Sequence, residues 1–131
     1  MSSSSNHTLS QHIIPRVVID TISHKFNICH ANVQSLCARR FCKFEEIKLM
    51  LLDSKISVCC FSETWLNDSI PDQAISVPGY HLVRNDRKYK RGGGIAMYIR
   101  DGFSFKAIYS TNVTASSVCK TECLVVELNI N

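Results

Sequence analysis

An apolar run that ends in a carboxylate stands near the middle of the chain: Ile56-Ser57-Val58-Cys59-Cys60-Phe61-Ser62-Glu63-Thr64-Trp65-Leu66. A short apolar run bounded by polar residues is typical of a strand that is buried on both faces. Glu63 therefore stands at the C-terminal end of a strand predicted over 56–62, which is where layered α/β folds place their chemistry. The alternative, that Glu63 simply ends a strand in solvent, stays open on this run alone.

A strand-helix-strand unit leads into this run. The first strand is predicted over 26–32, and apolar residues recur at helical spacing over about 38–53. A connection of this length suits a parallel crossover, so we expect Asn32 and Glu63 to lie within about 5 Å of each other at one sheet edge. Their amide and carboxylate oxygens are suitable ligands for Mg²⁺, or for Mn²⁺.

The second half of the chain predicts hairpins. Strands are expected at 80–84, 94–100, 103–109 and 122–129. Asp101-Gly102 lies between two apolar runs and predicts a hairpin turn. The three consecutive glycines at 92–94 lack the Lys-Ser/Thr of a phosphate-binding loop, so they indicate close backbone packing where a strand starts. A helix early and hairpins late predict an α/β (α+β) fold.

A basic cluster falls in the loop before the 94–100 strand. Its members are Arg84, Arg87, Lys88, Lys90 and Arg91. Tyr89 lies among them and Asp86 is the only acid, which is the electrostatic footprint of a contact with a phosphate backbone. A solvated hairpin whose basic edge discourages aggregation explains the same pattern equally well.

The composition is that of an ordinary globular chain. Of 131 residues, 45% are hydrophobic and 20% are charged, with a net charge of +4, which allows one domain with one core. No apolar stretch approaches the roughly 18 residues of a membrane span, and the N-terminus lacks the pattern of a signal peptide. We expect no membrane partner and an intracellular location, nuclear or cytoplasmic. Residues 1–25 are expected to be a disordered or unassigned leader, and 26–131 the folded part.

The seven cysteines are best interpreted as buried reduced thiols. Their number is odd, no secretory signal precedes them, and two of them lie within an apolar run. Cys37 with Cys42, and Cys119 with Cys123, come closest to the spacing of a zinc site, but these pairs fall at the start of a predicted helix and a predicted strand.

Five short motifs in sequence order add a family resemblance. They are Asn32-Val33-Gln34-Ser35-Leu36, Phe61-Ser62-Glu63-Thr64-Trp65-Leu66, Pro78-Gly79-Tyr80, Arg84-Asn85-Asp86-Arg87 and Gly92-Gly93-Gly94-Ile95-Ala96-Met97-Tyr98. Because these motifs occur in this order, the chain resembles the endonuclease/exonuclease/phosphatase superfamily. Within it, the chain is similar to the apurinic-like endonuclease domain of non-LTR retrotransposon polyproteins. The resemblance covers roughly residue 26 to the C-terminus and implies the N-terminal part of a two-layer α/β sandwich.

The resemblance also implies an activity and a site. Family members nick one strand of target DNA with a metal ion, and the free 3′-hydroxyl primes reverse transcription. It implies Asn32 and Glu63 as catalytic metal ligands, with DNA and a reverse transcriptase as partners. Gln34 stands where DNA-repair relatives have Asp and many retrotransposon relatives have Asn or another polar residue, so the resemblance assigns it no role.

The family's remaining catalytic motifs, Gly-Asp-Phe-Asn and Ser-Asp-His, do not occur in this sequence. We therefore expect a truncated domain without its C-terminal half, inactive by itself, with one sheet and its covering helix. Residues such as Val58 would then lie on an uncovered sheet face. The alternatives are a non-catalytic nucleic-acid-binding remnant, an inactive pseudogene-like product, and a related phosphoesterase. Trp65 and the motifs at 84–87 and 92–94 favour the retrotransposon branch.

Overall fold

A computed structural model describes residues 26–130 of the chain, so the leader expected at 1–25 lies outside the described residues. The elements follow in the order β1 (Ile28–Asn32), α3 (Cys42–Ser54), β2 (Val58–Ser62), η1 (Asp72–Ile75), β3 (Tyr80–Asn85), β4 (Ile95–Arg100), β5 (Ser104–Ser110) and β6 (Leu124–Asn129). Each predicted strand is present within a few residues of its expected bounds. The mixed α and β class is therefore confirmed.

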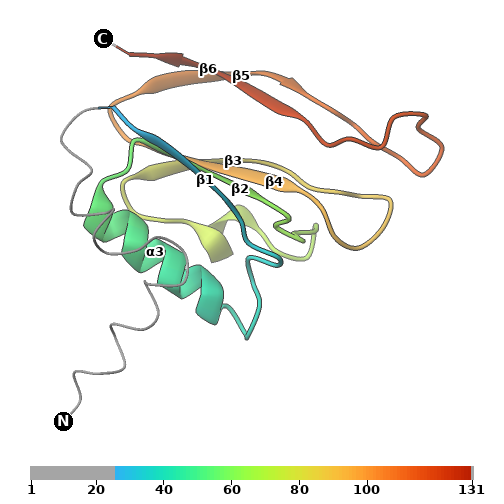
Figure 1. The fold of residues 1–131 in the computed structure, drawn as a ribbon, viewed down its shortest axis with the longest axis horizontal. Helices are drawn as coiled ribbons and strands as arrows, with labels where there is room; N and C mark the ends of the chain where they lie inside the picture. Colours follow the sequence, from blue (N-terminus) through green and yellow to red (C-terminus); the bar gives the residue numbers. More distant parts are fainter. Residues whose placement is uncertain (1–25, 131) are drawn as a thin grey trace.

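Four strands form the main sheet in the order β1-β2-β4-β3. The first two are parallel and in register, so that Asn32 is the partner of Ser62. The predicted crossover is therefore confirmed: α3 connects the two parallel strands and lies against one face of the sheet (Figure 1). The other neighbouring pairs, β2 with β4 and β4 with β3, are antiparallel.

The core lies between α3 and this sheet. Phe44, Ile47 and Leu51 are buried, as the helical spacing predicts. On the sheet side, the rings of Phe61 and Tyr98 pack edge to face with their centroids 5.9 Å apart. The Tyr98 hydroxyl also donates a hydrogen bond of 2.7 Å to the Ile75 carbonyl, so the buried phenol is satisfied.

The helix begins later than predicted. It starts at Cys42 rather than near residue 38, because Arg39, Arg40 and Phe41 have φ values of 56°, 53° and 70°. A left-handed backbone cannot continue into a right-handed helix. No side chain caps this N-terminus by a hydrogen bond, so the sequence lacks the residue that marks a helix start. Among the described residues, no helix is long and apolar enough to cross a membrane.

The expectation of a single sheet is wrong. Strands β5 and β6 pair as a second, two-stranded sheet, and this sheet lies over the face of the main sheet that α3 does not cover (Figure 1). Val58, expected on an uncovered face, is only 2% exposed. The His81 ring on β3 and the Phe105 ring on β5 contact each other across the two sheets, with their centroids 5.4 Å apart.

The hairpin predicted at Asp101-Gly102 is also wrong. The chain does turn there, but β5 does not pair with β4. Strand β4 already has β2 on one side and β3 on the other, so it offers β5 no free row of backbone hydrogen-bonding groups. Strand β5 leaves the sheet and pairs with β6 instead.

Candidate metal and nucleic-acid site

The structure brings the two predicted metal ligands to adjacent strand ends. Asn32 ends β1 and Glu63 directly follows β2. Beyond the strands, the two chain segments stay paired: the Val33 amide donates to the Ser62 carbonyl at 3.0 Å, and the Ser35 amide donates to the Glu63 carbonyl at 2.9 Å. The carboxyl edge of this parallel pair therefore carries both residues, as the crossover predicts.

The backbone at this edge is strained. Gln34 and Ser35 after β1 have φ values of 43° and 76°, and Glu63 and Trp65 after β2 have values of 55° and 56°. A non-glycine residue in the left-handed region costs on the order of 1–3 kcal/mol, and such residues concentrate at functional sites. Left-handed residues also flank α3, at 39–41 and 55. At this edge they stand on two paired strand ends at once, shortly after β1 and β2.

The Glu63 carboxylate is held in place through one of its oxygens. Its Oε2 accepts hydrogen bonds from the Trp65 indole Nε1 at 2.9 Å and from the Gly93 amide at 3.3 Å. Nothing within residues 26–130 donates to Oε1, which leaves that oxygen available to a ligand. Trp65 therefore positions Glu63, a role that the sequence motif alone does not reveal.

Asn32, at the end of the neighbouring strand β1, has an exposed amide side chain. Its Oδ1 accepts one hydrogen bond of 3.3 Å from the Gln34 amide. The Gln34 side chain is exposed, so its part in the site stays open. Within the described part of the chain, no three His, Cys, Asp or Glu side chains gather as a metal cluster. The donor set is thus one carboxylate and one amide, which suits a Mg²⁺ ion that keeps several waters.

The glycine run packs closely against this edge, as predicted. The Thr64 and Trp65 amides donate to the carbonyls of Gly94 and Gly93 at 3.3 Å and 2.9 Å. A Cβ at Gly94 would lie 2.7 Å from the Thr64 Oγ1, which is too close for a real side chain. These contacts bring the basic loop between β3 and β4 next to Glu63.

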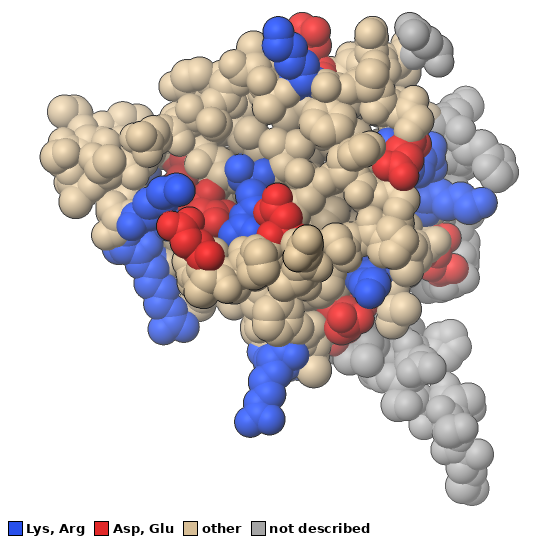
Figure 2. Space-filling view, turned by 180° about the vertical axis from the view of Figure 1, so that it is seen from behind, with Lys and Arg blue, Asp and Glu red and all other residues tan. Residues whose placement is uncertain are grey.

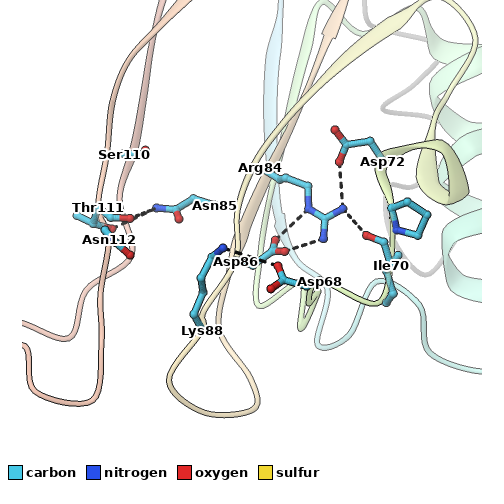
Figure 3. Close-up of a pocket in the computed structure, with 11 residues that line it drawn as sticks. Asp68, Ile70, Asp72, Arg84, Asn85, Asp86, Lys88, Ser110, Thr111 and Asn112 are labelled. Carbon is cyan, nitrogen blue, oxygen red and sulfur yellow. Dashed lines mark hydrogen bonds and ion pairs between the residues drawn. The ribbon is translucent and has the colours of Figure 1, made fainter.

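Arg84, the first member of the basic cluster, is part of the scaffold. Its guanidinium donates to the Asn67 and Ile70 carbonyls at 3.1 Å and 2.7 Å, and it forms ion pairs with Asp72 and Asp86 at 3.0 Å and 2.6 Å. Only 15% of the side chain is exposed. Figure 3 shows Ile70, Asp72 and Asp86 converging on the guanidinium. Arg84 therefore links the segment after β2 to β3.

Arg87 is likewise engaged. Its guanidinium donates to both carboxylate oxygens of Glu122, one of them, Oε2, at 3.3 Å. This hydrogen bonding raises the pKa of Arg87 and lowers the pKa of the Glu122 carboxyl. The pair connects the basic loop to the chain just before β6.

Acid should weaken this pair. Because the pKa of Glu122 is lowered in the folded state, its stabilising contribution is fully present above the unfolded pKa of about 4.5 and is lost as pH falls through the folded pKa. We expect Glu122→Gln to lower the melting temperature at neutral pH and to flatten its fall below about pH 5. Thermal melts across that range test this. An unchanged acid slope in the variant would contradict it.

Three cations remain exposed: Lys88, Lys90 and Arg91. Lys88 lies 3.7 Å from the exposed Asp68, a weak surface pair. Lys90 lies 5.7 Å from the Tyr89 ring centroid, and the Arg91 guanidinium lies 5.4 Å from that of Trp65. These are cation–π distances.

A cation from the second sheet joins them. Lys120, in the connection between β5 and β6, lies 5.1 Å from the same Tyr89 ring. Sequence reasoning missed this residue, because no local pattern connects it to a loop about 30 positions earlier. Figure 2 shows Lys and Arg side chains projecting from the side where these two loops lie. Exposed cations interleaved with aromatic rings suit a nucleic-acid backbone and its bases.

A polar pocket of about 610 Å³ lies beside this surface. Its walls come from the segment after β2, the end of β3, and the start of the β5–β6 connection (Figure 3). Asn85 crosses it and donates to the Thr111 and Cys123 carbonyls at 3.1 Å and 2.9 Å. Of its three carboxylates, Asp72 and Asp86 are paired with Arg84 and Asp68 lies near Lys88. The Asn85 hydrogen bonds therefore join β3 to the β5–β6 connection across this pocket.

The cysteines agree only in part with their interpretation as buried thiols. Cys59 is buried, Cys29, Cys37, Cys60 and Cys123 are half-buried, and Cys42 and Cys119 are exposed.

A comparison with protein-family models and a search of curated proteins both gave no match. The resemblance to the endonuclease family therefore rests on the sequence motifs.

Proposed function

We propose that this chain forms part of a Mg²⁺-dependent endonuclease of the endonuclease/exonuclease/phosphatase superfamily, related to the domain that nicks target DNA for non-LTR retrotransposons. One observation supports the proposal: Asn32 ends β1 and Glu63 directly follows the parallel neighbour β2, at one sheet edge with left-handed backbone. A loop with exposed cations packs against that edge. The finer assignment of the fold, part of a two-layer sandwich of this superfamily, belongs to the same proposal.

Each group at the edge has a chemical part. The oxygens of Glu63 and Asn32 would hold the metal, which when bound polarises the scissile phosphate. Trp65 and the Gly93 amide orient the carboxylate through Oε2, so that Oε1 keeps a fixed direction. Lys90, Arg91 and Lys120 would bind backbone phosphates and set the register of the DNA. No Asp is followed directly by His in the sequence. His81 and Asp101 pair at 3.0 Å, but they lie at the opposite end of β3 and β4 from Glu63, so this pair would not activate water at the edge.

The only tryptophan of the sequence reports directly on the proposed metal site. Because Trp65 donates to Glu63, paramagnetic Mn²⁺ bound at Glu63 should quench its fluorescence. We expect saturable quenching by Mn²⁺, reversed by excess Mg²⁺, and its loss in Glu63→Gln, which removes the charge and keeps an oxygen for the indole. Fluorescence titration of the purified chain measures this.

Asp68→Asn is the matched control, since it removes one carboxylate charge from an 89% exposed side chain whose ionic partner is Lys88. It should be quenched like the wild type. Quenching that persists in Glu63→Gln, or that never saturates in the wild type, would contradict the proposed metal site.

The exposed cations should account for DNA affinity. We expect Lys90→Ala, Arg91→Ala and Lys120→Ala each to weaken duplex binding and to reduce the slope of log affinity against log salt by about 0.9 for each phosphate that is no longer neutralised. Fluorescence anisotropy at several salt concentrations measures both quantities. Lys106→Ala, an exposed lysine nearer the other end of the β5–β6 pair, removes the same charge and should leave the slope unchanged.

A second function, nucleic-acid binding without catalysis, is favoured by the cations around Tyr89 and Trp65, which need no metal. DNA binding that follows these cations, together with no saturable Mn²⁺ quenching, would select this function over the endonuclease. Loss of both would reject the two proposals together.

A further inference from the structure

Two cysteines face each other across the parallel strands that lead to the proposed site. Cys29 on β1 is the register partner of Cys59 on β2. Their Sγ atoms lie 2.6 Å apart, although the residues are 30 positions apart in sequence. No other two cysteines within residues 26–130 have a sulfur–sulfur contact.

The backbone geometry allows a covalent bond between them. Neighbouring strands lie about 4.7–4.9 Å apart, which falls within the Cα separation of about 4.4–6.8 Å that disulfides require. Both side chains point to the helix-covered face, where Cys59 belongs to the core and Cys29 packs against it. Cys60, the next residue, alternates to the opposite face and is therefore excluded as a partner.

We propose that Cys29 and Cys59 form an oxidation site, at which a peroxide converts the two thiols into an intrachain disulfide that joins β1 to β2. Cys29 reacts first, because it is half-buried on an edge strand, whereas Cys59 is fully buried. The inference does not depend on the proposed endonuclease function.

The electrostatics assign the same order of reaction. The hydrogen bond with Cys59 lowers the pKa of the Cys29 thiol, so Cys29 is the better thiolate. The same hydrogen bond, together with burial, raises the pKa of Cys59. Cys59 thus stays a protonated thiol until its neighbour has been oxidised.

The chemistry balances in two steps. The Cys29 thiolate attacks one oxygen of hydrogen peroxide, breaks the O–O bond and becomes a sulfenic acid, while hydroxide leaves. Cys59 then attacks the Cys29 sulfur, the S–S bond forms, and the Cys59 proton leaves with the sulfenic oxygen as water. The two thiols lose two electrons, which reduce the peroxide. A thiol such as glutathione would reverse the bond by exchange.

Mass spectrometry tests the site without any variant. After limited hydrogen peroxide, we expect the wild-type chain to lose two hydrogen atoms and a non-reducing digest to contain the peptide of Cys29 linked to that of Cys59. The oxidised chain should melt about 5–15 °C higher, since the bond closes a long loop of the unfolded chain. Glutathione should restore the starting mass and melting temperature.

Variants separate the two roles. In Cys59→Ala, Cys29 loses the hydrogen bond that lowers the pKa of its thiol. A sulfenic acid should therefore form there more slowly than the wild-type cross-link, but it should persist and be trapped by dimedone, whereas Cys29→Ala should yield neither product. Cys60→Ala is the matched control and should form the linked peptide like the wild type. The proposal is overturned if wild-type cross-links join other cysteines only, or if peroxide leaves both thiols free for alkylation.

Discussion

Replacing Arg84 with alanine is expected to lower the free energy of unfolding by about 3–5 kcal/mol, because it leaves a buried charge without its partner. The Asp86 side chain is only 9% exposed and is paired with Arg84 at 2.6 Å. The substitution also removes the hydrogen bonds that the Asn67 and Ile70 carbonyls accept. Chemical denaturation of the two proteins measures the difference.

Two further variants make this result specific. Arg91→Ala removes an equal charge from an exposed position in the same loop and should change stability by less than about 0.5 kcal/mol. Arg84→Met combined with Asp86→Leu removes both charges, so it should cost less than Arg84→Ala alone. If Arg84→Ala melts like Arg91→Ala, Arg84 is a surface cation and becomes a candidate for DNA binding again.

Substituting Gly94 with alanine should cost about 3 kcal/mol, the sum of two effects that each cost on the order of 1–3 kcal/mol. The first is backbone strain, since φ at Gly94 is +89°. The second is crowding, since the added Cβ would lie 2.7 Å from the Thr64 Oγ1. The same denaturation experiment measures the loss.

Gly102→Ala isolates the backbone effect, because φ there is +102° and nothing lies within 4 Å of the added Cβ. It should cost about half as much as Gly94→Ala. Thr64→Ala should partly rescue Gly94→Ala, since the Thr64 Oγ1 is buried, has no hydrogen-bond partner and is the crowded atom. Equal losses at the two glycines would mean that the glycine run is not closely packed.

Local patterns in the sequence were enough to predict the strands, the helix and the position of Asn32 and Glu63 at the ends of two paired strands. The apolar run before Glu63 and the helical spacing before it depend on neighbouring residues, so they predict the crossover. The second sheet could not be predicted in this way. Its formation depends on β4 being flanked on both sides, which is a property of the whole sheet and not of the Asp101-Gly102 turn.

The same limit applies to the basic cluster. In the sequence, residues 84–91 are rich in cations and nothing distinguishes one from another. In the structure, Arg84 pairs with Asp72, 12 residues earlier, and Arg87 pairs with Glu122, 35 residues later. No spacing within the loop distinguishes these two arginines from Lys90 and Arg91. Only the folded chain shows which cations are neutralised, and only there does Lys120 join the exposed ones.

The β5–β6 sheet has a consequence for motion. Most residues of β5 are exposed, and near the basic loop the sheet is fastened to the rest by Asn85 and by Arg87 with Glu122. Because no strand pairing joins β5 or β6 to the main sheet within the described residues, we expect the β5–β6 sheet to separate from it at a fraction of the free energy that unfolds the whole chain. A polyanion that contacts Lys90 and Lys120 together would hold the two sheets against each other. Its binding would therefore reduce this local opening as well as neutralise charge.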